Sequence, residues 1–136
     1  QEYDQGGDSF DLLGNVVPSV KIATGSYVGT GTSGNAHPNS LTLPFIPKVV
    51  IVNTTRRTDG QYTPAYRFGV FFCYGLDSEY NSLGGAWMYV NNNTVAWSLN
   101  ENYAKLVGTT LSWYTKASGA ESQLNGSYQY DYLAIG

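Results

Sequence analysis

The chain has 136 residues, which is enough for one domain with a single hydrophobic core. Charged residues make up only 12% of it, whereas Tyr occurs 12 times and Gly 16 times, a composition typical of extracellular or virion β-proteins rather than cytosolic enzymes. The net charge is −3 and the seven basic residues are scattered apart from Arg56 and Arg57, which argues against nucleic-acid binding, and no apolar run is long enough to cross a bilayer.

Residues 1–19 predict a lead-in segment rather than a part of the core. Four of the ten carboxylates fall within it, a Gly-Gly pair interrupts it, and its first half has no helical or strand period. It also lacks the basic-then-apolar order of a signal peptide. We therefore expect the domain proper to span residues 20–136, and the chain to be soluble without inserting into a membrane.

From residue 20 onward, short runs rich in Val, Ile, Thr, Tyr, Phe and Trp alternate with Gly, Asn, Asp, Ser and Pro, which predicts an all-β domain. The one stretch with helical spacing, "SLNENYAKLVG", is short and fits an ordered loop equally well. An antiparallel β-sandwich of about six to eight short strands, or a small barrel, fits this pattern. Strands are expected near 20–28, 40–43, 48–53, 65–74, 86–90, 95–99, 109–115 and 127–135, with a hairpin turn in "VNNNTV".

The final stretch, "YQYDYLAIG", has two faces that are both partly apolar. Alternate residues from Tyr128 to Ala134 should point one way, and alternate residues from Gln129 to Ile135 the other. The strand is therefore expected inside a sheet with both faces at least partly covered. The apolar run 49–52 favours the same conclusion, with cover from a second sheet or from a neighbouring subunit, while Pro44 and Pro47 predict a bend before it.

Residues with catalytic or metal-binding chemistry are scarce. The single histidine, His37, lies in a Gly/Ser/Asn-rich stretch and is expected to be a solvated loop residue, and Cys73 in "GVFFCYG" is expected to be a buried, unreactive thiol. Asp77 and Glu79 supply only part of a calcium shell. "YVGTGTSGN" lacks the lysine of a P-loop and the spacing of a dinucleotide fingerprint, so it predicts a flexible connection between strands. We expect a non-catalytic chain with no cofactor and no metal site.

Three stretches resemble a known family when taken together: "KIATGSYVGTGT", "SLTLPFIPKVVIV" and the closing "YQYDYLAIG". Their order is similar to that of the C-terminal receptor-binding domains of bacteriophage tail fibres, in which a glycine-rich opening and an F-x-P-K-x-V-x-V strand precede a terminal Y-x-Y-x-A-I-G. The last two stretches also resemble the strand pattern of H-type lectins. The resemblance covers residues 21–52 and 127–136.

This resemblance implies an antiparallel sandwich that assembles as a homotrimer at the tip of a virion fibre, facing the extracellular side. It implies binding to a bacterial surface glycan or protein and attachment to other tail or virion proteins. The sugar-binding residues of H-type lectins do not map onto the middle of this sequence, so none is carried over.

Loops at the ends of a sandwich are the usual place for a ligand site. If the strands alternate in direction, the loops 75–85 and 100–108 meet at one end, with carboxylates, amides and tyrosine rings that suit sugars. The opposite end offers Arg56, Arg57, Asp59, Tyr62 and Asn92, which suit an anionic polymer. We favour the first end, whose candidate ligand-binding residues are Asp77, Glu79, Tyr80, Asn81, Asn100, Glu101, Asn102 and Tyr103.

Three other functions fit the same residues. One is a structural module that trimerises or decorates a virion, and another is a free lectin of the H-type pattern. A third is a polysaccharide-degrading enzyme, which would need a suitably spaced pair among the ten acids.

Overall fold

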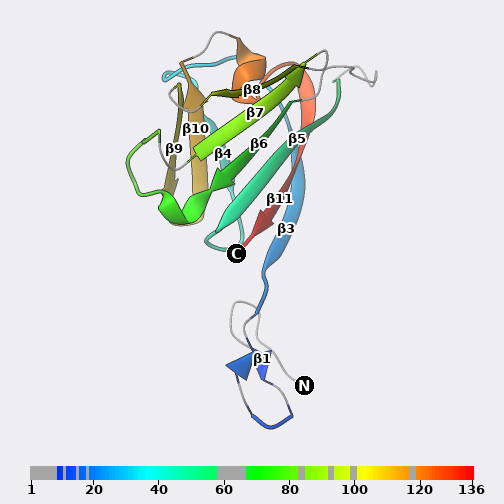
Figure 1. Cartoon of the computed structure of the whole chain (residues 1–136), viewed down its shortest axis with the longest axis vertical. Coiled ribbons are helices and arrows are strands. Elements are labelled where there is room, and N and C mark those ends of the chain that lie inside the picture. The colour runs from blue at the N-terminus through cyan, green and yellow to red at the C-terminus, as the bar shows by residue number, and fades with distance from the viewer. Residues whose placement is uncertain are drawn as a thin grey trace.

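The computed structural model describes residues 9–10, 12–14, 16–17, 19–57, 67–82, 85–91, 94–98, 101–116 and 119–136. Of residues 9–10, 16–17, 55–57, 67, 85–91 and 94–98 it describes the backbone alone. Two antiparallel sheets face each other (Figure 1). The larger has six strands in the order β3 (Ile22–Val28), β11 (Tyr128–Ile135), β5 (Val49–Arg57), β6 (Arg67–Phe72), β7 (Gly85–Asn91) and β8 (Thr94–Ser98). The smaller has three strands in the order β4 (Asn39–Thr42), β10 (Thr110–Thr115) and β9 (Asn102–Val107).

Short elements complete the described chain. β1 (Ser9–Phe10) and β2 (Val16–Val17) form a two-stranded hairpin within the lead-in segment, drawn well apart from the sandwich in Figure 1. Two 3-10 helices, η1 (Cys73–Gly75) and η2 (Ala120–Gln123), follow β6 and precede β11. Neither of these described helices has the length that a bilayer crossing requires.

The core lies between the two sheets and is centred on Trp113. Its ring is fully buried, with the Phe71 ring 4.8 Å away and the Tyr27 ring 6.3 Å away, and its Nε1 donates to the Gln123 carbonyl at 2.8 Å. This bond satisfies the one polar group that the indole carries into the core. The other large core side chains are Leu41, Leu43, Val50, Val52, Leu111, Leu124 and Tyr130.

These observations confirm the antiparallel sandwich. The expected strands agree with the observed ones to within about two residues at most described ends, and β7 and β8 pair Asn91 with Thr94, as a hairpin with a two-residue connection requires. The connecting residues 92–93 lie outside the described part. The bend expected at the two prolines separates β4 from β5. Cys73 is buried, as expected, and burial raises the pKa of its thiol to about 12.

One expected element is wrong. Residues 102–107 form strand β9, paired with β10, whereas the sequence suggested an ordered loop or a helical turn. The strand is obscured because polar residues fall on both of its faces: Ala104 and Leu106 face the core together with Asn102, and Lys105 faces outward between Tyr103 and Val107. Among the described residues the sandwich has nine strands, and the chain leaves the large sheet after β8 instead of continuing the meander.

The closing strand β11 lies between β3 and β5, inside the large sheet as the sequence predicted. Tyr130 and Ala134 are buried on its inner face, and the alternate residues are half-buried on the outer one. The backbone of Gly136 exchanges hydrogen bonds with Lys21, at 2.9 and 3.4 Å. A side chain at Gly136 would overlap the ring of Phe45, so the last residue packs closely against the segment between β4 and β5.

Two rows on the outer face of the large sheet are largely apolar, whereas the following row holds Ser26, Asp131 and Asn53. Because the inner residues of β3, β11, β5 and β6 alternate with outer ones, the register aligns an outer row of Ile22, Ile135, Val49 and Phe72, of which the first and last are exposed by 63% and 47%. The next row consists of Thr24, Leu133, Ile51 and Val70. We call these eight residues the apolar outer face.

Candidate functional site

Three tyrosines gather on the outer face of the small sheet. Alternation along β9 and β10 directs Ala104 and Trp113 into the core, and therefore Tyr103 and Tyr114 to the opposite face. These two tyrosines are directly paired in the ladder, and their rings stack with centroids 5.1 Å apart and planes 11° apart. Tyr80 meets the Tyr114 ring edge-on, with centroids 4.9 Å apart. We call Tyr80, Tyr103 and Tyr114 the tyrosine cluster.

The segment that carries Tyr80 is held against β9 by its backbone. The Leu106 N–H donates to the Asp77 carbonyl at 2.8 Å, and Asn81 and Ala104 exchange two hydrogen bonds of 3.1 Å. The Asp77 carboxylate accepts the N–H of Glu79 at 2.9 Å and so closes the turn before Tyr80. Tyr80 therefore stands next to a fixed bridge rather than at the tip of an open loop.

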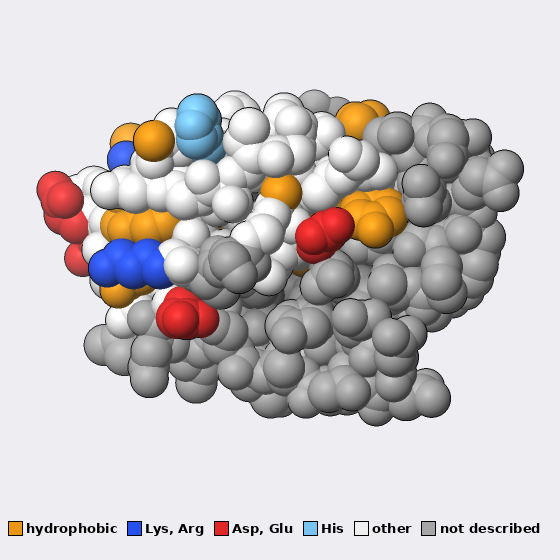
Figure 2. Space-filling view, turned by 90° about the horizontal axis from the view of Figure 1, so that it is seen from above, with side chains coloured by type: hydrophobic (Ala, Val, Ile, Leu, Met, Phe, Trp, Pro, Cys, Tyr) orange, Lys and Arg blue, Asp and Glu red, His pale blue; other side chains and the backbone are white. Residues whose placement is uncertain are grey.

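Two lysines lie over the rings of the cluster. Lys105 Nζ is 4.5 Å from the centroid of Tyr80, and Lys116 Nζ is 4.8 Å from that of Tyr103. Both distances are within the range of cation–π attraction, worth about 0.5–1 kcal/mol at exposed sites. Figure 2, which looks onto the molecule from above, shows a basic side chain between hydrophobic ones, with backbone and uncharged side chains, drawn in white, over much of the described surface.

Hydroxyl groups extend this face across β10 and β4. Thr42 and Thr110 share a hydrogen bond of 3.0 Å, and Ser112 Oγ donates to Ser40 Oγ at 3.5 Å. Burial and the neighbouring Tyr114 ring raise the pKa of Tyr80, while its hydrogen bond with Ser112 opposes the rise. The Tyr80 phenol therefore keeps its proton at neutral pH and can both donate and accept.

The side chains on this face can bind sugars and anionic groups. Aromatic rings cover the C–H faces of sugars, hydroxyls bond to sugar hydroxyls, and ammonium groups attract carboxylate or phosphate. Among the described residues, no group of three or more His, Cys, Asp and Glu is placed to hold a metal ion.

The structure brings together some of the residues proposed from the sequence. The segment around Tyr80 and strand β9, which were expected to meet at one end of the sandwich, lie side by side. Tyr80 and Tyr103 both contact the ring of Tyr114. Asp77 and Asn81 fix the approach of Tyr80, and Glu79 is exposed beside them. At the other side, exposed Glu101 receives the Lys116 N–H and the Thr115 hydroxyl on its carbonyl.

One of the proposed residues lies elsewhere, and another is not described. The Asn102 side chain is fully buried on the inner face of β9, so a surface contact with a ligand is wrong for this residue. It was expected in a loop, but the period of the strand turns it inward when Tyr103 turns outward. Asn100 lies outside the described residues.

Sequence reasoning missed Tyr114, Lys105 and Lys116. The signal was present, since Tyr103 and Lys105 are two residues apart and fall on one face of a strand. The unrecognised strand β9 concealed that signal. At the opposite end, only the backbone of Arg56 and Arg57 is described, and Asp59, Tyr62 and Asn92 lie outside the described residues.

Comparison of the chain with protein-family models, with curated proteins and with solved structures finds no match.

Proposed function

We propose that this chain is a non-catalytic receptor-binding domain, of the kind found at the tips of bacteriophage tail fibres, that attaches a virion to a glycan on a bacterial surface. The observation that carries the proposal is the tyrosine cluster with a lysine over each of two rings. The half-buried rings of Tyr80 and Tyr103 and a row of hydroxyls supply both kinds of contact that a sugar needs, while Tyr114, which both rings contact, is buried. The ordered sequence motifs of the first and last strands support the virion setting.

The two lysines favour an anionic glycan. A net charge of −3 gives the whole chain no general attraction for anions, and Asp77, Glu79 and Glu101 are exposed beside the cluster, so an acidic group of a glycan would have to bind at the lysines themselves. Lys105 and Lys116 place two ammonium groups on the tyrosine cluster. We therefore propose glycans that carry carboxylate or phosphate groups, with a surface protein as the alternative receptor.

The apolar outer face supports assembly as a homotrimer on a virion. Ile22 and Phe72 stand exposed at the ends of a continuous apolar row, and a face of this kind on a soluble domain usually meets another protein surface. Its two rows contain no charged residue, so copies of the same face can meet without electrostatic repulsion. The proposed occupant of this face is a second copy of the chain.

This face also favours the structural alternative, a module that trimerises or decorates a virion. Deleting the domain would then prevent fibre assembly, while changes in the tyrosine cluster would leave adsorption unchanged. A free lectin would bind glycans but would not associate with virion proteins.

Binding of the isolated domain to an array of bacterial surface glycans tests the proposal. We expect acidic glycans to bind, and we expect Lys105→Ala and Lys116→Ala each to weaken binding about two- to tenfold, as loss of a partly exposed charge contact should. Lys48→Ala is the matched control, because Lys48 is exposed and lies on the bend between β4 and β5. Binding that is equal in all four proteins, or absent from every glycan, would contradict the proposal.

A further inference from the structure

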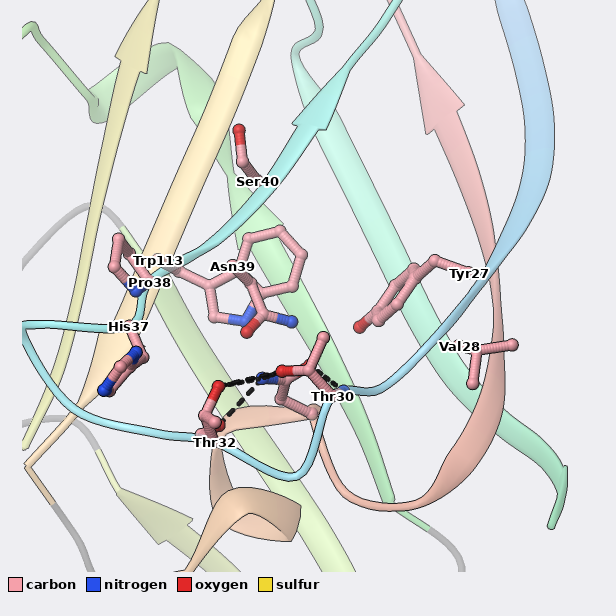
Figure 3. Close-up of a pocket in the computed structure, with 10 residues that line it drawn as sticks. Tyr27, Val28, Thr30, Thr32, His37, Pro38, Asn39, Ser40 and Trp113 are labelled. Atoms are coloured by element: carbon pink, nitrogen blue, oxygen red, sulfur yellow. Dashed lines mark hydrogen bonds between the residues drawn. The ribbon is translucent and has the colours of Figure 1, made fainter. Parts of the chain in front are cut away.

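A second concave site lies where the edges of the two sheets diverge. Its volume is about 340 Å³, at the low end of the range for small-molecule sites. Tyr27 reaches it from β3, Asn39 and Ser40 from β4, and Thr30, Thr32 and His37 from the connection between those strands. In Figure 3 the Tyr27 hydroxyl is directed toward Asn39, His37 lies on the opposite side, and the Ser40 hydroxyl points away from the other labelled side chains.

The connecting loop 29–38 is fixed in place by two buried amides. Asn125 Oδ1 accepts the Thr30 N–H at 3.0 Å, and its Nδ2 donates to Thr30 Oγ1 at 2.8 Å and to the Thr32 carbonyl at 2.7 Å. Gln123 Oε1 accepts the Gly34 N–H at 2.8 Å, and its Nε2 donates to the His37 carbonyl at 2.7 Å. The stretch that the sequence predicted as a flexible connection is therefore held at four points along its length. Such preorganisation lowers the entropic cost of binding a ligand.

The loop leaves hydrogen-bonding capacity directed at the cavity. Thr30 Oγ1 and Thr32 Oγ1 are 2.8 Å apart, and both receive the Asn125 Nδ2 amide, at 2.8 and 3.3 Å. Only one of the two hydroxyl protons can lie between these oxygens, so the other is available to a ligand. The exposed side chains of His37 and Thr32 lie at the rim.

The described lining residues are mostly polar, and none of them is Asp, Glu, Lys or Arg. Burial raises the pKa of the Tyr27 hydroxyl far above its usual range, so this group stays neutral while it donates to the Leu124 carbonyl at 2.8 Å. Val28 and Pro38 add apolar surface. A charged ligand finds no counter-ion here, whereas a compact, uncharged ring with several hydroxyls finds donors, acceptors and apolar contact together.

We propose that this cavity is a second carbohydrate site, which binds a single neutral pyranose residue. It lies on the edge between the sheets and does not include any residue of the tyrosine cluster, so it goes beyond the proposed function and holds whether or not that cluster binds an acidic glycan. The two sites would therefore bind different groups. The lysines of the tyrosine cluster would bind charged groups, and the loop cavity would bind a neutral sugar ring.

Amide chemical-shift mapping with methyl glycosides of glucose, galactose, mannose and N-acetylglucosamine tests this site in the full chain. We expect at least one glycoside to shift the amides of Thr30, Thr32 and Asn39 in a saturable manner, and methyl glucuronoside to do so more weakly. His37→Ala, which removes a rim side chain and leaves the backbone bond to Gln123 in place, should weaken binding about two- to tenfold. Thr32→Val, which removes one hydroxyl of the threonine pair at the rim, should act in the same direction.

A double variant of the tyrosine cluster, Tyr80→Ala with Tyr103→Ala, should leave these shifts and their affinity unchanged, which separates this site from the proposed function. Conserved amide spectra of the His37 and Thr32 variants outside the loop would show that they fold. The proposal is overturned if no neutral glycoside shifts the loop amides at the highest soluble concentration, if both rim variants bind as the unchanged protein does, or if the glucuronoside binds most tightly.

Discussion

Replacing Gln123 with Met should destabilise the domain and release the loop between β3 and β4. Methionine has nearly the same length and volume, so the change removes hydrogen bonds without leaving a large cavity. Gln123 is fully buried and makes four hydrogen bonds, two accepted by Oε1 and two donated by Nε2. One of its donors, the Thr115 N–H at 3.0 Å, is itself buried.

The magnitude follows from these contacts. Removing the acceptor of the buried Thr115 N–H costs about 1–3 kcal/mol, and each bond on the more exposed loop side has a net value of roughly 0.5–1.5 kcal/mol, which water partly replaces. The free energy of unfolding should therefore fall by about 3 kcal/mol in total. Since each kcal/mol changes the Tm of a domain of this size by roughly 3–5 °C, the Tm should fall by about 10 °C.

Thermal and urea unfolding measure this loss, and hydrogen exchange locates it. The Gly34 and Thr115 amides should lose protection, whereas the amides of β5 and β6 should keep theirs until global unfolding. Gln129→Met is the matched control, because Gln129 is half-buried on the outer side of β11, and it should change stability by no more than about 0.5 kcal/mol. Equal stability of the two variants, with protection of Gly34 retained, would refute the role assigned to Gln123.

Three further predictions concern other parts of the sandwich. Gly29→Ala should lower the free energy of unfolding by about 2 kcal/mol or more in urea, because a Cβ at this position would overlap the backbone carbonyl of Gly126; wild-type stability would contradict this packing. Phe72→Asp should dissociate the proposed trimer in light scattering, whereas Val107→Asp, equally exposed on the small sheet, should not; a monomeric unchanged protein would contradict the trimer. Because burial raises the pKa of Cys73 from 9.0 to about 12, the unfolded chain ionises first and stability should fall as pH rises between these values; a Cys73→Ala variant with the same decline would show that other groups cause it.

The sequence predicted the large sheet well because its strands carry strong local signals. The apolar run of β5 and the alternation of β11 fix which side chains face the core, and the observed burial of Val50, Val52, Tyr130 and Ala134 follows that alternation. The central place of β11 also follows from its two partly apolar faces. Both observations depend only on neighbouring residues in one strand.

The candidate site was predicted only in part because it depends on pairing between distant residues. Tyr80 and Tyr103 were named, but their meeting through Tyr114 requires the register of β9 with β10, which alternation within a single strand does not specify. The loop cavity was missed for a similar reason. Its fixed shape comes from Gln123 and Asn125, which lie about 90 residues away in sequence from the loop they hold.

The affinity of the purified domain for an acidic polysaccharide from a bacterial surface, compared between the unchanged protein and the Tyr80→Ala, Tyr103→Ala double variant, tests the central claim most directly. Tyr74→Ala serves as the control, since Tyr74 is 75% exposed and its ring contacts Phe72 rather than the tyrosine cluster. Loss of two ring contacts of about 1 kcal/mol each predicts a fall in affinity of at least tenfold in the double variant, and little change in the control. Equal affinity in all three folded proteins would contradict a glycan site at the tyrosine cluster.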